Sequence, residues 1–150
     1  MLSIREATIE DSQLYFDWVN NIDVRRNSID SDFIDIEDHL KWFSNAIKND
    51  QIHMYVLEIN SKEVGQVRFN INTNIAEVDY SIAEPFRSKG YGRYLLKESI
   101  KILCNEVNQI NFIKAIVKSI NIPSIKVFKQ LNFKCSRINN KKIVLCSFKC

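Results

Sequence analysis

Glycine is scarce in this sequence: it occurs three times in 150 residues, and two of the three are Gly90 and Gly92. Long apolar runs are missing as well, since none approaches the roughly 18 residues that a membrane-spanning helix requires. The sequence has no CxxC pair, and its two histidines are not spaced as zinc partners for its four cysteines. No internal repeat or low-complexity segment is visible. These absences argue against a transmembrane protein, a zinc-binding module and a repeat protein.

The composition that is present is that of an ordinary globular protein, with 45% hydrophobic and 26% charged residues. A chain of this length is expected to form one domain over residues 1–150. The first residues carry acids early and lack the apolar core of a secretion signal, so we expect a cytoplasmic protein. Its cysteines are then expected to be reduced thiols that serve as small apolar residues. The net charge of +3 suits a small anionic ligand and gives only a weak argument for nucleic acid.

The spacing of apolar residues predicts the element order β-α-α-β-β-β-α-β-α-β-β. Strands are predicted at residues 2–9, 52–59, 64–71, 75–82, 111–118, 133–138 and 142–148, with a turn at 139–141. Helical spacing predicts apolar faces made by Leu14, Tyr15, Trp18 and Val19, by Ile36, Leu40, Phe43 and Ile47, and by Leu96, Ile100, Leu103 and Val107. The polar segment 20–32 is typical of a loop or a broken helix, and a last helix is expected to begin at Asn121.

This order predicts an α/β (α+β) fold, in which about four helices flank one mixed, mostly antiparallel sheet of about seven strands. The strand, loop, helix and strand between residues 75 and 118 are expected to form a parallel crossover.

The two neighbouring glycines lie in the segment RSKGYG, between a predicted strand and a predicted helix. A helix N-terminus presents unpaired N–H groups and the positive end of the helix dipole. Glycine lets the backbone curl around an anion without a Cβ in the way, and Arg87, Lys89 and Arg93 add mobile positive charge. The segment therefore predicts a pyrophosphate-binding loop, and the alternative is a tight turn with a solvated basic face. It lacks the GKS or GKT ending of a Walker loop, and its single GxG is not a dinucleotide-binding fingerprint.

The stretch VDYSIAEPFRSKGYGRYLLKESI resembles the acetyl-CoA-binding motif of the GNAT N-acetyltransferases, in which a strand leads through Arg/Gln-x-x-Gly-x-Gly/Ala into a helix. Downstream, NIPSIKVFKQLNFK is similar to the Asn-x-x-Ser helix of this family and to the short strand that follows it. The resemblance extends over essentially the whole chain and includes the predicted element order. It implies the GNAT fold and an acyltransferase that uses acetyl-CoA as co-substrate, with no metal.

The resemblance also implies how the cofactor is bound. Backbone groups near Ile82 and Ala83 would pair with the pantetheine arm, and the loop would hold the pyrophosphate. The second motif would contact the pantetheine, the thiol end and the phosphates. The expected cofactor-binding residues are Ile82, Ala83, Arg87, Ser88, Lys89, Gly90, Tyr91, Gly92, Arg93, Asn121, Ser124, Phe128 and Lys129.

Acetyl transfer requires a neutral amine, a polarised thioester carbonyl and a proton for the leaving thiolate. Glu77 matches the strand position where the family often has the carboxylate that accepts the amine proton, and Asp79 follows on the same face. The alternative is that both acids face solvent, or that one pairs with an arginine such as Arg68.

The proton donor for the leaving thiolate departs from the family pattern. Many members have a tyrosine four residues after the motif serine, where this sequence has Phe128. Another group or water would have to replace it, with Tyr80, Tyr91 and Tyr94 as unranked substitutes, or the thiolate would leave unassisted.

The N-terminal third is expected to form the acceptor side. The patterns W-x-N-x-x-x-V-R-x-N-S, E-x-H-x-x-W-F and G-Q-V-R-F look like the subgroup that acetylates the C4 amine of a UDP-linked or free dideoxy aminosugar for pseudaminic- or legionaminic-type sialic acids. His39 is expected to be a hydrogen-bonded structural residue more than a base, and Trp18 to pack in the core. The expected substrate-binding residues are Arg25, Asn27, His39, Trp42, Gln66 and Arg68.

Two other interpretations stay open at this point. One is a protein N-terminal acetyltransferase of the ribosomal-protein type, which shares the W-x-N style of helix. The other is a module that binds acetyl-CoA without turnover, because the tyrosine is missing. The expected partner is a small-molecule amine, with no nucleic acid and no membrane, and the expected state is a monomer or a homodimer.

Overall fold

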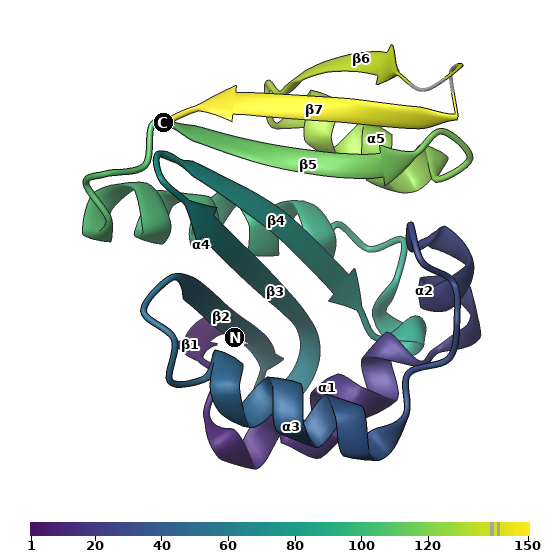
Figure 1. Cartoon of the computed structure of the whole chain (residues 1–150), viewed down its shortest axis with the longest axis vertical. Helices are drawn as coiled ribbons and strands as arrows, with labels where there is room; N and C mark the ends of the chain where they lie inside the picture. The colour runs from purple at the N-terminus through teal and green to yellow at the C-terminus, as the bar shows by residue number, and fades with distance from the viewer. Residues whose placement is uncertain (139, 141) are drawn as a thin grey trace.

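The structure, a computed structural model, describes residues 1–138, 140 and 142–150 (Figure 1). The predicted turn at 139–141 therefore lies partly outside the described residues. The strands are β1 Leu2–Glu6, β2 Ile52–Ile59, β3 Lys62–Asn72, β4 Ile75–Ile82, β5 Phe112–Lys118, β6 Lys134–Ile138 and β7 Ile143–Lys149. The α-helices are α1 Ser12–Val19, α2 Ile22–Asn27, α3 Ile36–Ala46, α4 Tyr91–Glu106 and α5 Ile122–Gln130, and short 3₁₀ helices occupy Ile9–Asp11 and Glu84–Phe86.

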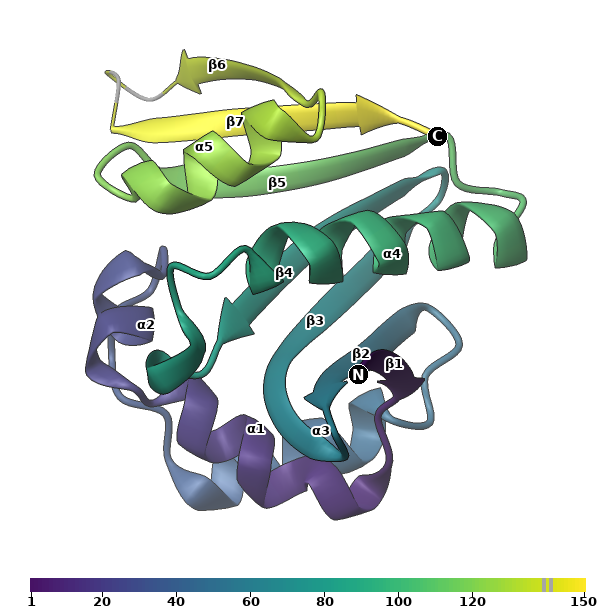
Figure 2. The same ribbon diagram turned by 180° about the vertical axis from the view of Figure 1, so that it is seen from behind.

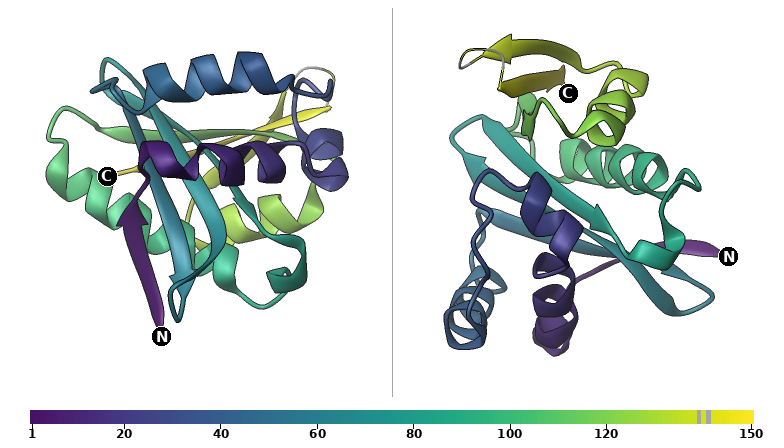
Figure 3. Two further views of the ribbon diagram at one scale, coloured as in Figure 1. Left: turned by 90° about the horizontal axis from the view of Figure 1, so that it is seen from below. Right: turned by 90° about the vertical axis from the view of Figure 1, so that its right-hand side faces the viewer.

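The strands form one seven-stranded sheet in the order β1-β2-β3-β4-β5-β7-β6. β4 and β5 pair in parallel through the crossover helix α4, and the other neighbouring strands of the described chain pair antiparallel. Helices α4 and α5 cover one face of the sheet, and α1 and α3 cover the opposite face (Figures 2 and 3). The predicted mixed, mostly antiparallel sheet and the parallel crossover are therefore confirmed.

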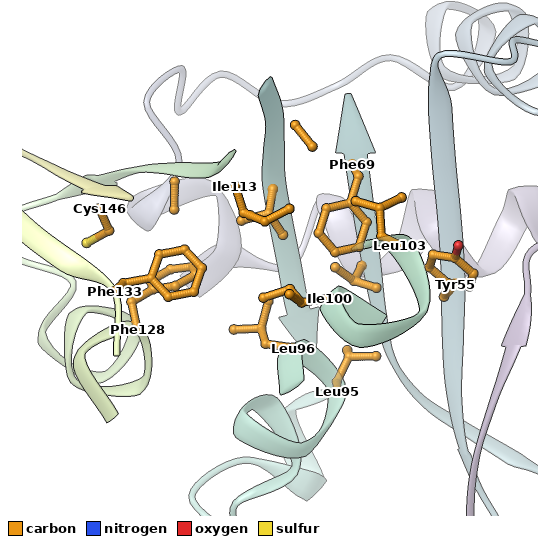
Figure 4. Close-up of a cluster of buried hydrophobic side chains, with 14 of the residues drawn as sticks. Tyr55, Phe69, Leu95, Leu96, Ile100, Leu103, Ile113, Phe128, Phe133 and Cys146 are labelled. Carbon is orange, nitrogen blue, oxygen red and sulfur yellow. The ribbon is translucent and has the colours of Figure 1, made fainter. Parts of the chain in front are cut away.

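The main core lies between the sheet and helices α4 and α5 (Figure 4). Because side chains alternate between the faces of a strand, Phe69 of β3 and Val78 of β4 point to the same side, where Leu96 and Leu103 of α4 pack on them. A second, smaller cluster packs α1 and α3 against β2 and contains Tyr15, Phe43, Ala46, Met54 and Val56. Helices α1 and α3 therefore cover β2 on this face of the sheet. They do not cover β4, whose acidic side chains on the same face stay exposed.

Two details of the helices differ from the sequence-based expectation. Segment 20–32 contains the short helix α2, whose N-cap residue Asn21 accepts hydrogen bonds from the N–H groups of Asp23 and Val24, so the described chain has five α-helices. Helix α3 buries His39, where the apolar pattern predicted Leu40, and Leu40 is exposed. The buried face is rotated because Nε2 of His39 donates a hydrogen bond to the Ser12 carbonyl oxygen at 2.8 Å, which satisfies the imidazole inside the α1–α3 contact.

The expectation of four reduced thiols is wrong for this structure. Cys104 of α4 is joined by a disulfide to Cys150, and Cys135 of β6 is joined to Cys146 of β7. The second pair forms because the two residues are direct partners in the β6–β7 register, with Cα atoms 4.1 Å apart. Motifs of closely spaced cysteines cannot reveal these pairs. The pairing of β6 with β7 brings one pair together, and the C-terminal end of the chain, which lies near α4, brings the other together. None of the helices that the structure describes has both the length and the apolar composition to cross a membrane.

Candidate active site

The pairing between β4 and β5 stops part-way along the two strands. Residues 75–77 pair with residues 112–114, whereas β4 continues to Ile82 and β5 to Lys118. Beyond this point the strands diverge, and Figure 1 shows α2 beside the wide end. We call the diverging segments, 78–82 of β4 and 115–118 of β5, the fork. A strand edge without a neighbouring strand offers backbone groups with which an extended ligand can pair.

The loop between β4 and α4 joins the wide end of the fork. Gly90 is the N-cap of α4 and has a left-handed backbone, with φ of 85°, and Ser88 is also left-handed, with φ of 61°. No side chain of the described residues caps this helix start. The N–H groups of the first turn of a 16-residue helix therefore point into a curled, basic loop, which is the arrangement that suits an anion.

The two glycines of this loop have different structural reasons. A Cβ at Gly90 would meet no atom of the described chain within 4 Å, so the residue is required by its positive φ alone. A Cβ at Gly92 would lie 3.1 Å from Cε2 of Tyr80, so this glycine makes room for a tyrosine ring of β4. The sequence led us to expect that both glycines clear space for the pyrophosphate. In the structure, Gly90 gives the loop its left-handed turn, and Gly92 makes room for the Tyr80 ring.

Arg87 connects the loop to α2. Its Nε donates to the Ile82 carbonyl oxygen at 2.9 Å, and its terminal nitrogens donate to Asp23 and to Asn21, each at 3.2 Å. The basic side chains of Lys89 and Arg93 are exposed at the same loop. At the end of the fork, the Ala83 N–H donates to the Val64 carbonyl oxygen at 2.8 Å, so this group already has a partner in β3.

Helix α5 follows β5 and lies on the same face of the sheet as α4 (Figure 2). The side chain of Asn121 caps α5 by accepting a hydrogen bond from the Ser124 N–H. Ser124 is buried, and its Oγ lies 3.2 Å from the hydroxyl oxygen of Tyr80, which reaches α5 from β4. Phe128 is buried beneath the same tyrosine in an edge-to-face contact with 5.8 Å between ring centroids, while Lys129 is exposed. The motif serine and phenylalanine thus meet the Tyr80 side chain.

The opposite face of β4 carries the two candidate acids. Glu77 and Asp79 point to the α1 and α3 side, and their side chains are 46% and 62% exposed. Oε2 of Glu77 lies 3.9 Å from Nζ of Lys114 on β5, and Oδ2 of Asp79 lies 4.0 Å from a terminal nitrogen of Arg68 on β3. The predicted alternative that one acid pairs with Arg68 therefore holds for Asp79.

Arg68 also contacts Trp42 of α3, whose ring centroid lies 5.0 Å from the guanidinium carbon. Nε of Arg68 is buried and has no hydrogen-bond partner among the described residues. Trp42 is 36% exposed, and Gln66, two residues before Arg68 on β3, is buried and donates to the Ser81 hydroxyl at 3.0 Å. Three of the six expected acceptor-side residues, Trp42, Gln66 and Arg68, thus lie around one polar region of β3 and β4.

The other three expected acceptor-side residues lie elsewhere. His39 is 4% exposed and packs against Phe16 in the contact between α1 and α3, as its structural interpretation predicted. The guanidinium of Arg25 donates to carbonyl oxygens of Val19, Asp30 and Asp32 and to the Ser28 hydroxyl. The side-chain amide of Asn27 donates to the Asp23 carbonyl oxygen at 3.1 Å. Arg25 and Asn27 therefore hold α1, α2 and the loop after α2 together.

Two residues near the fork were missed from the sequence. Lys114 pairs with Glu77, and Nζ of Lys118 donates to the Arg26 carbonyl oxygen at 2.9 Å, beside α2. Both residues belong to β5, whose sequence is mostly apolar. Because they are four residues apart on a strand, their side chains point to the same face of the sheet, and this spacing is the one sign of them in the sequence. That signal becomes informative once β5 is known to be the parallel neighbour of β4.

The sequence matches the profile of the acetyltransferase (GNAT) domain over residues 1–134. The chain belongs to this family. A relative from Bacillus subtilis (strain 168), named "Putative phosphinothricin acetyltransferase YwnH", is 30% identical over 119 residues, which cover 73% of this chain and 69% of the relative.

Solved structures with this fold include other GNAT enzymes at low identity. Spermidine N-acetyltransferase from Vibrio cholerae, in complex with CoA and spermine, superposes with a TM-score of 0.87 and 17% identity and covers 99% of this chain and 95% of its own. Ribosomal-protein-alanine N-acetyltransferase from Brucella melitensis gives a TM-score of 0.81 and 20% identity, with 99% of both chains covered. At these identities the likeness shows the fold alone.

The family membership makes this chain an acetyl-CoA-dependent N-acetyltransferase of the GNAT type. The residues present fit the cofactor: the fork offers a strand edge for an extended arm, and the left-handed loop at α4 offers N–H groups and lysine and arginine side chains for phosphates. No group of three metal-ligating side chains occurs within residues 1–138, 140 and 142–150.

Proposed function

We propose that this acetyltransferase acts on a primary amine of an anionic small molecule, most specifically the C4 amine of a UDP-linked dideoxy aminosugar of the pseudaminic or legionaminic acid type. The observation that carries this proposal is the charge around the Glu77 carboxylate. Lys114 and Lys118 of β5 and Arg68 of β3 lie on the same face of the sheet as this acid. Two of these cations are paired with Glu77 and Asp79, so the five side chains together keep an excess of one positive charge, that of Lys118, for the acceptor.

The sign of these charges favours one class of acceptor over another. A diphosphate carries negative charge that lysine and arginine side chains attract, and it would gain charge-assisted hydrogen bonds there. A polyamine carries several positive charges, which the same side chains would repel. Trp42 and Arg68 add a flat apolar and cationic surface of the kind that suits a uracil or a sugar ring.

Glu77 is proposed to accept the proton of the acceptor amine, directly or through water. Its carboxylate lies on the acceptor face where the fork begins, and Lys114 at 3.9 Å holds it there. Asp79 is proposed to orient Arg68 toward the acceptor. Acetyl-CoA supplies the activated acetyl group, and residues 82–83, the loop at 87–93 and the first turn of α5 are proposed to hold it.

Acetyl-CoA turnover with a panel of acceptors tests the substrate. We expect kcat/KM to be highest for a UDP-linked 4-amino sugar, lower for the free sugar, and lowest for spermidine and for N-terminal peptides. Lys118→Met should raise KM for the UDP-linked sugar about 5-fold or more, with little effect on the free sugar, because one charge-assisted contact is lost. Lys101→Met, an exposed lysine on α4, is the matched control. Fastest turnover of a peptide or of spermidine would overturn the proposal.

The role of Glu77 is tested separately from the acceptor. Glu77→Gln should lower kcat by about 100-fold or more, while the CoA dissociation constant measured by calorimetry stays close to that of the wild type. Asp79→Asn should have a smaller effect on kcat, and exposed Glu10→Gln should have none. A Glu77→Gln enzyme with nearly unchanged kcat would show that Glu77 is not the base.

We also propose a cytoplasmic location, where acetyl-CoA is available. Disulfides are uncommon in that compartment, so the two bonds of the structure give a direct test. If the protein is cytoplasmic, trapping of thiols in intact cells should label exposed Cys150 before denaturation, which would mean that its bond to Cys104 is not formed in the cell. Protection of all cysteines from labelling would point to an oxidising compartment instead.

A further inference from the structure

We propose that the Tyr80 hydroxyl donates the proton that the CoA thiolate takes up as it leaves. The proposal concerns the acetyl transfer at the fork and rests on the proposed cofactor site, but it is independent of which amine is acetylated. Phe128 occupies the α5 position beside the fork and carries no donor. Tyr80 brings a hydroxyl to the same place from the neighbouring strand.

The tyrosine side chain is held from three sides. Its hydroxyl oxygen lies 3.2 Å from Oγ of Ser124, its ring edge packs on Phe128, and its Cε2 lies where a Cβ of residue 92 would approach to 3.1 Å. The glycine at position 92 thus admits the ring between the start of α4 and the start of α5. A phenol fixed between the pyrophosphate loop and the Asn-x-x-Ser turn lies beside the proposed path of the pantetheine arm.

The other two tyrosines of the region are directed elsewhere. Tyr91 packs against Phe86 in the loop, with 6.5 Å between ring centroids. Tyr94 packs against the main core cluster from one turn further along α4. Among the hydrogen bonds of the described residues, the one between Tyr80 and Ser124 is the one that joins a hydroxyl of these three tyrosines to α5, which carries the second motif.

The environment of Tyr80 keeps its phenol in the protonated form. Burial raises the pKa of the Tyr80 phenol, the hydrogen bond with Ser124 opposes this, and the negative charge of Asp79 raises the pKa further. The phenol therefore stays protonated at neutral pH and can act as a donor. In the step proposed, the amine nitrogen forms a bond to the acetyl carbon and gives up one proton to the proposed base Glu77. The carbon–sulfur bond breaks, and its electron pair leaves with sulfur, which takes the Tyr80 proton. The Ser124 hydroxyl then passes a proton from water to the phenolate.

Calorimetry without any acceptor gives the first test. Wild-type protein should bind CoA about fivefold more tightly than desulfo-CoA, because the hydroxyl donates to sulfur. Tyr80→Phe should bind desulfo-CoA as the wild type does and lose the preference for CoA. Tyr55→Phe is the matched control, since its buried hydroxyl in the core has no hydrogen-bond partner among the described residues.

Turnover with any active amine gives the second test. Tyr80→Phe should lower kcat about 100-fold with little change in the KM for acetyl-CoA, and the double variant Tyr80→Phe with Phe128→Tyr should recover at least tenfold of the loss by returning a phenol to α5. If Tyr80→Phe keeps both the wild-type kcat and the preference for CoA, the proposal is overturned. Loss of the affinity for desulfo-CoA would instead overturn the donor role in favour of a structural one. A wild-type protein that binds neither CoA nor desulfo-CoA would refute the proposed cofactor site.

Discussion

Replacement of Gly90 by alanine is predicted to weaken CoA binding about 5- to 30-fold while leaving the fold intact. Gly90 has φ of 85°, and a Cβ there would meet no described atom within 4 Å, so the substitution changes only the backbone energy. A left-handed conformation disfavours a residue with a Cβ by about 1–2 kcal/mol. In the free protein the loop can relax away from that conformation. The full cost of about 1–2 kcal/mol then opposes CoA binding, and it corresponds to an increase of about 5- to 30-fold in the Kd for CoA.

Isothermal titration of CoA into wild type, Gly90→Ala and Gly90→Asn measures this effect, with thermal unfolding to check the fold. Asparagine tolerates the left-handed region, so Gly90→Asn should bind CoA more tightly than Gly90→Ala. Gly92→Ala provides the contrast, because its Cβ would press on Tyr80 and should lower kcat more than CoA affinity. Equal affinity of Gly90→Ala and wild type would refute the reasoning, and the loop would then be only a turn.

Three further predictions concern stability. Because Arg5 holds the pKa of buried Asp11 below its usual range, the pair stabilises the fold above the unfolded pKa of about 4 and loses this effect as pH falls through the folded pKa. Asp11→Asn should thus lower Tm by about 4–8 °C at pH 7. The difference in Tm between the wild type and the variant should become smaller as the pH is lowered, and a difference that does not change with pH would contradict this. Gly65→Ala should lower Tm by a similar amount, because its Cβ would lie 2.6 Å from Cδ1 of Ile82 and 3.0 Å from the Ser81 carbonyl oxygen. A Tm equal to that of the wild type would show that β3 can shift to make room for the Cβ. In urea, loss of the Cys104–Cys150 bond through Cys104→Ser should cost about 4 kcal/mol for a separation of 46 residues, and no loss would show that the bond is not formed in solution.

The sheet and its helices could be predicted because each depends on local periodicity. The alternation of β4 and the spacing of Leu96, Ile100 and Leu103 in α4 place their side chains without knowledge of the rest of the chain. The buried face of α3 could not be predicted in this way. A polar residue, His39, takes a core position there because a carbonyl of another helix is available to it.

The curled loop at the start of α4 could be predicted from its glycines, and its role in binding the cofactor stays a prediction. The surroundings of the expected acceptor-side residues were predicted less well. Arg25 has the chemistry of a phosphate ligand, yet its donors are taken by carbonyl oxygens of the loop that follows α2. Lys114 and Lys118 give little signal in an apolar strand and lie at the fork only because β5 pairs in parallel with β4. Contacts that depend on which strands are neighbours cannot be derived from spacing along a single segment.

The position of Arg87 has a consequence for how the two substrates affect each other's affinity. One guanidinium joins the loop, which is proposed to bind the cofactor, to Asn21 and Asp23 at the start of α2. A phosphate that drew this side chain away would release the start of α2, so the two binding events would be linked in free energy, and the linkage would be equal in both directions. Calorimetry should then show that CoA and the acceptor change each other's Kd by the same factor, and Arg87→Ala should bring that factor close to one.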